Sequence, residues 1–318
     1  MLRFFANADY DFIGLRRRAY IFSGVLLGVL LVSALFFQFT RGSWLEYGVD
    51  FAGGTLIQVT FNEPATTAEV RDAIEQGLSG AQVSQFGGEN AFVIRTPVMG
   101  EAASGTAFRV PELLEQRFGA GAFVVDRNEE VGAKVGGELQ SKAAIAVLLS
   151  FAATLIYLAF RFEWRFGLAA VIATGHDVVL TIGVISALQF EVALPTVAAV
   201  LTIVGYSLND TIIIFDRVRE NLHGPGKRLP FVDVLNLSIN ATLPRTVLTG
   251  STTLATLLAL FLFGGTVVRE FAVIMIIGIT LGTYSSIFVA APALRAIEKQ
   301  WPRDTKKAKR PATAKAAL

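Results

Sequence analysis

Long apolar blocks separated by polar connections dominate the pattern of the chain. We expect six of them to cross a membrane, at about residues 19–39, 142–160, 166–188, 194–216, 245–264 and 270–294. A bilayer core about 30 Å thick requires roughly 20 consecutive apolar residues in a helix. The first block follows three arginines but is too long for a typical signal peptide and lacks a small-residue cleavage site after it, so we interpret it as an uncleaved span.

The region between the first two spans, residues 40–141, has the pattern of a water-soluble α+β domain. Residues 55–61 alternate and are rich in β-branched side chains, which predicts a strand. Thr66 and Glu69 form the capping-box pattern that begins a helix over residues 66–78. The further elements are a hairpin of strands 83–86 and 91–95, a helix over 108–118 and a strand over 122–127. The order β-α-β-β-α-β predicts a ferredoxin-like domain.

The positive charges predict an orientation, because Lys and Arg concentrate in cytoplasmic loops. With residues 1–18 in the cytoplasm, the basic tail over residues 295–318 is cytoplasmic as well. The basic residues of the cytoplasmic connections are Arg16, Arg17, Arg18, Arg161, Arg165, Arg217, Arg219, Lys227 and Arg228. The acid-rich soluble domain then lies outside, on the opposite side of the membrane.

Composition agrees with a membrane protein and excludes several kinds of site. Of the 318 residues, 53% are hydrophobic and 17% are charged, against roughly 25% charged in an average soluble domain. The chain has no cysteine, which excludes disulfide scaffolds and thiolate metal sites. Two histidines are too few for a histidine metal cluster, so we expect no metal and no cofactor.

The fourth span holds an acid that needs an explanation. An ionisable side chain near the bilayer centre costs roughly 2.5–3.5 kcal/mol on insertion scales. Asp210 lies about two turns inside this span, and Tyr206 and Asn209 share its helix face. Arg245 opens the fifth span at a depth where it could meet Asp210 across a helix interface. The polar residues that accompany this pair are Tyr206, Ser207, Asn209, Thr211, Thr249, Thr252 and Thr256.

Two interpretations of Asp210 remain open: a structural ion pair or interhelical hydrogen bond, and a proton relay. The hydrated polar seam favours the relay, with Asp210 and Arg245 as its candidates and protons as the coupling ion. A modest rearrangement around a buried carboxyl beside an arginine can change whether it holds a proton. One charge crossing the membrane supplies about 2.3 kcal/mol per 100 mV. The threonines can instead bond to their own helix, so none is compelling singly.

Other features of the spans favour structural interpretations. His176 and Asp177 form a second polar pair, for which hydrogen bonding to a neighbouring helix is favoured over a relay role. Gly278, Gly282 and Ser286 form a face of small residues that lets another helix approach closely, in this chain or in a partner. The glycine-rich stretch over residues 50–55 is adequately explained by a tight turn before the first strand.

At these motifs the sequence resembles the SecF family, which is related to the RND transporters. The resemblance covers nearly the whole chain. It is carried by Gly48–Thr55, by Val204–Thr211 with its continuation Phe215–Asn221, by Arg245-Thr246 and by Gly282–Ser286.

The resemblance implies a non-enzymatic, proton-coupled subunit of protein export in a bacterial cytoplasmic (inner) membrane, with the soluble domain in the periplasm. Its implied partners are a separate SecD-like subunit, the SecYEG channel, the translocating unfolded polypeptide and membrane lipid, with no nucleic acid. It assigns the proton pathway to Asp210 and Arg245. Two other classes remain: a half-size RND-type exporter of small molecules acting as a homodimer, and a membrane scaffold or sensor. A domain of about 100 residues argues against the exporter, and a scaffold leaves the polar seam unexplained.

Overall fold

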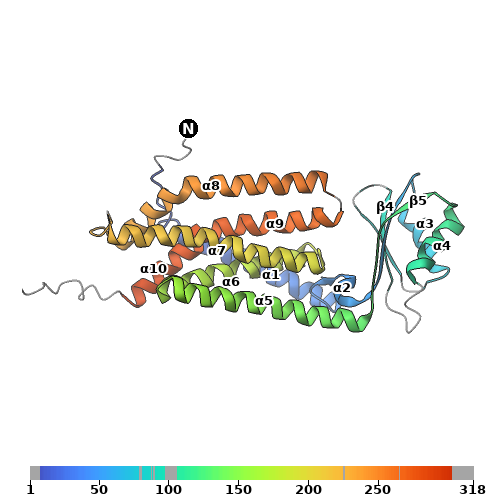
Figure 1. Cartoon of the computed structure of the whole chain (residues 1–318), viewed down its shortest axis with the longest axis horizontal. Coiled ribbons are helices and arrows are strands. Elements are labelled where there is room, and N and C mark those ends of the chain that lie inside the picture. Colours follow the sequence, from blue (N-terminus) through green and yellow to red (C-terminus); the bar gives the residue numbers. More distant parts are fainter. Residues whose placement is uncertain are drawn as a thin grey trace, which may run out of the picture.

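The computed structural model describes residues 8–78, 81–86, 88, 90–96, 106–224, 226–264 and 266–302. Six helices in this part of the chain are long and apolar enough to cross a membrane. They form an elongated bundle, and a small α+β domain between the first and second lies at one end of it (Figure 1). The predicted fold class is therefore confirmed.

The membrane helices extend beyond the predicted apolar blocks. α5 begins at Ala133, within the region predicted to be soluble, and α8 begins well before residue 245. A helix can continue past the apolar layer, so the limits of the membrane-embedded part stay predictions. The helices are α1 (Arg16–Arg41), α5 (Ala133–Arg161), α6 (Trp164–Ala187), α7 (Leu194–His223), α8 (Phe231–Phe263), α9 (Thr266–Ser285), a π-turn (Ser286–Ala290) and α10 (Ala291–Gln300). The predicted tail beyond residue 302 lies outside the described residues.

The α+β domain has the predicted order of elements. They are β2 (Gly54–Phe61), α3 (Thr67–Glu75), β3 (Gln82–Gln85), β4 (Ala91–Thr96), α4 (Thr106–Phe118) and β5 (Phe123–Val131). The sheet is antiparallel with strand order β3-β4-β2-β5, so β2 is a central strand. Residues 87 and 89 of the predicted hairpin turn lie outside the described residues.

One face of the sheet is covered by α3 and α4, which lie on the side away from the membrane bundle (Figure 1). The core between them buries Ile57 and Phe92 from the sheet against Ile74 and Leu114 from the helices. Each such side chain contributes roughly 1.5–3 kcal/mol when removed from water. The capping box at Thr66 and Glu69 is confirmed, and the hydrogen bonds that Glu69 accepts from Thr66 hold the pKa of its carboxyl below the usual range.

A short segment, residues 46–54, joins the domain to the membrane bundle, and we call it the strap. It contains β1 (Glu46–Tyr47), which pairs in parallel with β6 (Glu191–Val192), and α2 (Val49–Ala52). Asp50 of the strap accepts a hydrogen bond from the backbone N–H of Leu194, at 2.9 Å from Oδ2. A carboxylate is favourable at this point, because Leu194 begins α7 and the N-terminus of a helix carries partial positive charge. The predicted turn is therefore also the cap of a membrane helix.

The two glycines that end the strap have a conformational reason. Gly53 and Gly54 have φ angles of +73° and +129°, a region that residues with a side chain rarely adopt. On the outer face of the strap, Gly136 of α5 approaches it closely: a Cβ there would lie 2.9 Å from the carbonyl oxygen of Phe51. The strap is thus held by α5 and α7 and continues directly into β2.

We predict that Asp50→Ala loosens the first turn of α7. Losing a capping side chain costs about 1 kcal/mol, which corresponds to roughly fivefold faster local exchange. Hydrogen exchange of the amides of Leu194 and of residues 196–198 measures this, since Pro195 has no amide hydrogen, with residues 218–222 at the far end of α7 as an internal control. Asp50→Asn keeps an acceptor oxygen and should show a smaller effect. Unchanged exchange in Asp50→Ala would show that the cap does not stabilise the helix.

Candidate functional site in the membrane helices

The centre of the bundle is formed by the third, fourth and sixth spans. In the most apolar windows of α6, α7 and α9–α10, 50%, 50% and 56% of the residues are buried, against 11%, 6% and 17% in α1, α5 and α8. Polar side chains that face inward from α6, α7 and α9 are therefore out of contact with lipid. Polar side chains on the outer face of α8 are exposed in the chain taken alone.

Asp210 points into the bundle from α7 and is 1% exposed. Its Oδ2 atom is buried and has no hydrogen-bond partner within the described residues. The hydroxyls of Thr211 on the same helix and of Thr246 on α8 are also buried without a partner there. An unpaired carboxylate oxygen costs several kcal/mol in an apolar environment unless the group is protonated or finds a partner. Asp210 is thus suited to hold and release a proton.

Arg245 lies on α8, which packs against α7, but its side chain is exposed. Its charge acts on Asp210 through space, whereas no ion pair between the two is present in the described part of the chain. Thr249, Thr252 and Thr256 are exposed as well, and each hydroxyl donates to a backbone carbonyl of its own helix. The polar stripe predicted on this helix therefore exists, and it faces outward.

The other residues predicted to support Asp210 lie in different parts of the bundle. Asn209 is exposed, while the Tyr206 ring faces α8 beside Gly250. Ser207 is buried and donates its hydrogen bond to Asp177 of α6. Its role is thus in a second polar group, on the α6 side of α7.

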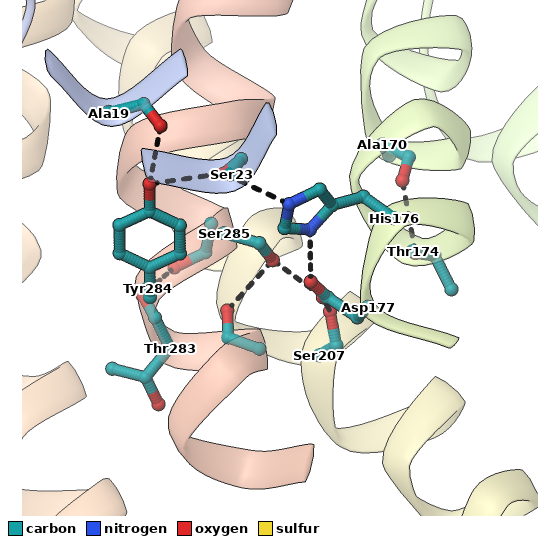
Figure 2. Close-up of polar contacts among 12 residues, drawn as sticks. Ala19, Ser23, Ala170, Thr174, His176, Asp177, Ser207, Thr283, Tyr284 and Ser285 are labelled. Atoms are coloured by element: carbon teal, nitrogen blue, oxygen red, sulfur yellow. Dashed lines mark hydrogen bonds and ion pairs between the residues drawn. The ribbon is translucent and has the colours of Figure 1, made fainter. Parts of the chain in front are cut away.

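That second group is an extended hydrogen-bond network around His176 and Asp177 (Figure 2). Asp177 is fully buried, and its Oδ2 accepts hydrogen bonds of 2.5 Å from Ser207 of α7 and from Ser285 of α9. Its Oδ1 lies 3.0 Å from Nδ1 of His176. On the other side of the ring, Nε2 lies 3.1 Å from the hydroxyl of Ser23 on α1.

The network ends at α1 and α9. Tyr284 of α9 donates to the carbonyl oxygen of Ala19 at 3.0 Å, and its hydroxyl lies 3.2 Å from that of Ser23. Four helices therefore meet at one buried pair. Ser23, Tyr284 and Ser285 are absent from the sequence-based candidates. Tyr284 and Ser285 lie in the Gly282–Ser286 motif, which was the signal available for them, whereas Ser23 is a single serine in an apolar span and carries no distinguishing pattern. The sequence signal for the network itself was the pair His176 and Asp177, because they are adjacent polar residues inside a span.

Small residues of α9 allow α7 to approach. A Cβ on Gly282 would lie 3.0 Å from Cβ and 3.2 Å from Cα of Ser207. A Cβ on Gly278 would collide with the side chain of Ile203. Ser286 is buried and bonds to the carbonyl oxygen of Thr283 in its own helix. Both glycines thus face a helix of the same chain, and Gly282 sets the position of a serine in the network.

We predict that Gly282→Ala destabilises the protein by about 1–3 kcal/mol, the usual cost of overpacking a tight contact. The added methyl group meets the backbone of α7 at Ser207, which cannot move as a flexible side chain does. Thermal unfolding in detergent measures the loss. Gly205→Ala on α7 is the matched control, since a Cβ there meets nothing within 4 Å. Equal stability of the two variants would contradict the close approach.

Comparison with protein families places these features in a known context. Residues 114–300 match the family described as "Protein export membrane protein SecD/SecF, C-terminal", and residues 42–65, which include the strap, match the "SecD/SecF GG Motif". The chain is 46% identical to the protein translocase subunit SecF of Gemmatimonas aurantiaca over 310 residues, covering 95% of this chain and 91% of that protein. It is 46% identical to that of Magnetococcus marinus over 293 residues, covering 91% and 92%.

Solved structures of SecDF have the same fold. The crystal structure of SecDF from Thermus thermophilus, a translocon-associated membrane protein, superposes with a TM-score of 0.80 at 35% identity. That match covers 92% of this chain and 39% of the other. A second structure, of SecDF in the super-membrane-facing form, gives a TM-score of 0.65 at 36% identity. This chain therefore spans about two-fifths of the SecDF chains that it matches.

The six apolar helices and the family match together define a multi-pass membrane protein of the protein-transport machinery. The chain belongs to the SecF family of protein translocase subunits.

Proposed function

We propose that this SecF subunit uses the proton motive force to promote protein export across the bacterial cytoplasmic membrane. Asp210 is the residue that takes up and releases the proton, and Arg245 is the positive group that acts on it. The observation that carries the proposal is a buried aspartate on a central membrane helix with an oxygen that has no partner in the described chain. Such a group is costly in a membrane and is expected to have a function.

The exposed face of α8 supports a SecD-like subunit as the direct partner. Arg245 and the threonines at 249, 252 and 256 are all exposed on this helix. A charged side chain facing lipid at this depth is unfavourable, whereas a second subunit can cover it and supply polar partners. This chain covers 39% of the SecDF chain that it matches, so that chain contains a further part, which agrees with a partner completing the site.

The orientation in the membrane and the further partners are also part of the proposal. The distribution of basic residues supports cytoplasmic termini and a periplasmic α+β domain in the bacterial inner membrane. We propose the SecYEG channel and the translocating unfolded polypeptide as further partners, with membrane lipid around the helices. A homodimeric small-molecule exporter is the alternative. The α+β domain argues against it, because its core is filled by its own helices and strands.

We predict that Asp210→Asn removes potential-dependent export and leaves assembly intact. The amide is similar in size but cannot exchange a proton at neutral pH. One charge crossing 100 mV is worth about 2.3 kcal/mol, so we expect export under a membrane potential to fall roughly tenfold to fiftyfold. The measurement compares export into inverted membrane vesicles with and without an ionophore, in a strain lacking the native copy.

The matched control is Asp233→Asn, which changes an exposed aspartate in the first turn of α8. It should export as the wild type does. Wild-type export from Asp210→Asn would exclude Asp210 as the proton carrier, whereas loss of the assembled complex in that variant would assign it a structural role.

We also predict that the SecD-like partner covers the α8 stripe. The chain has no cysteine, so Thr252→Cys provides a single reactive thiol without background. Its labelling by a membrane-permeant maleimide should be blocked when the partner is co-expressed. Leu148→Cys, on an exposed position of α5, is the control and should stay reactive. Protection of Thr252→Cys without any partner would favour the homodimeric exporter.

A further inference from the structure

The network around His176 contains a line of four hydrogen-bond contacts that crosses three helices (Figure 2). It runs from the carbonyl oxygen of Ala19 to the hydroxyl of Tyr284, then to Ser23, to Nε2 of His176, and from Nδ1 to Oδ1 of Asp177. The four distances are 3.0, 3.2, 3.1 and 3.0 Å. The contacts at 3.0, 3.1 and 3.0 Å lie within the range of ordinary hydrogen bonds, and the contact between the hydroxyls of Tyr284 and Ser23, at 3.2 Å, is a longer and weaker one.

Each of these contacts needs one hydrogen. Tyr284 and Ser23 supply one each, and a neutral imidazole supplies one, while a backbone carbonyl and an ionised carboxylate supply none. The groups in their neutral-pH forms therefore offer three hydrogens for four contacts. The line is complete only if the site holds one additional proton.

The direction of each bond is fixed from the carbonyl end. The oxygen of Ala19 can only accept, so Tyr284 donates to it. Ser23 must then donate to the Tyr284 oxygen, and Nε2 of His176 must donate to Ser23. A neutral ring with its hydrogen on Nε2 presents a bare Nδ1 to the carboxylate of Asp177, which would be repulsive.

We propose that His176 and Asp177 form a proton-binding site, in which one exchangeable proton is shared between Nδ1 and Oδ1. The proton gives either an imidazolium beside a carboxylate or a neutral imidazole beside a carboxylic acid. The pair is electrically neutral in both forms, and it becomes an anion when the proton leaves. Because the side chains of His176 and Asp177 are only 9% and 1% exposed, the neutral, loaded form avoids an uncompensated buried charge.

The surroundings contribute hydroxyls rather than competing charges. Oδ2 of Asp177 already accepts hydrogen bonds from Ser207 on α7 and Ser285 on α9. These two hydrogen bonds stabilise the carboxylate but do not supply the missing proton. Tyr284 on α9 is the titratable group that faces the ring, and α1 presents Ser23. The titratable group that contacts Asp177 is His176 itself.

Release of the proton has a structural consequence. With three hydrogens left, the ring takes the Nδ1–H form to bond the carboxylate, and Ser23 turns to donate to Nε2. The contact between Ser23 and Tyr284, the longest of the four at 3.2 Å, then has no hydrogen. Loss of the proton therefore weakens the attachment of α1 to α9. A role for this proton in export rests on the proposed function, whereas the proton count does not.

Nitrogen NMR of the histidine ring in liposomes, on the chain assembled with its partner, tests the count. This chain has two histidines, His176 and His223, so His223→Gln assembled with an unlabelled partner leaves one labelled ring. We expect a hydrogen on Nε2 at neutral pH and a switch to a bare Nε2 when the pH is raised. A neutral ring with a bare Nε2 throughout about pH 5 to about pH 8, the range in which histidine ordinarily titrates, would overturn the proposal.

Tyr284→Phe gives the sharper test. It removes the contacts of Tyr284 with Ala19 and with Ser23, together with the Tyr284 hydroxyl hydrogen. The hydrogens of Ser23 and of the neutral ring then suffice for the two remaining contacts, and no additional proton is needed. We expect the Nδ1–H ring with a bare Nε2 at a pH where the wild type carries hydrogen on Nε2. Ser23→Ala gives the same balance and the same expected switch, which guards against misfolding of one variant. Tyr206→Phe is the control, because Tyr206 lies outside the network and should leave the spectrum unchanged.

A hydrogen on Nε2 in both Tyr284→Phe and Ser23→Ala would contradict the count. These spectra do not depend on export, so they stay informative if Asp210→Asn exports normally and the proposed function fails. Conversely, loss of export in Asp210→Asn together with an unchanged ring in Tyr284→Phe would retain the relay at Asp210 and exclude the second proton site.

Discussion

The carboxylate of Asp177 is the point on which the arrangement of the inner membrane helices depends. It accepts hydrogen bonds from Ser207 and Ser285 and contacts His176, so α6, α7 and α9 are fixed to one buried group. A carboxylate cannot remain buried in an apolar bundle without such partners. Gly282 makes the arrangement possible, because the absence of a side chain there lets α9 come close to Ser207. Packing and hydrogen bonding thus specify the same helix positions.

The two buried aspartates of the bundle, Asp177 and Asp210, differ in how the cost of burying a carboxylate is met. Asp177 is surrounded by donors, whereas Asp210 has a buried oxygen without a partner in the described residues. They lie on neighbouring helices, and Ser207 is one turn of α7 before Asp210. A change in the position of α7 therefore alters the surroundings of both. The cap that Asp50 provides at the start of the same helix also joins α7 to the external domain.

The sequence was sufficient to predict the six spans, the soluble domain and its order of elements, because hydrophobic period and capping residues are local signals. It was also sufficient to single out Asp210 and His176-Asp177, since polar residues in apolar spans are conspicuous. It could not assign Ser207 to Asp177 or find Ser23 and Tyr284, because those contacts depend on how distant helices pack. The outward direction of Arg245 and the cap by Asp50 depend on the same tertiary geometry.

We propose that Asp210 carries a proton only when a SecD-like partner completes the site beside α8. Proton uptake into liposomes under an imposed membrane potential tests it most directly, with this chain reconstituted alone or together with that partner. We expect uptake from the assembled pair, no uptake from either subunit alone, and none from the pair that carries Asp210→Asn. Uptake by this chain alone, or by the pair with Asp210→Asn, would contradict it.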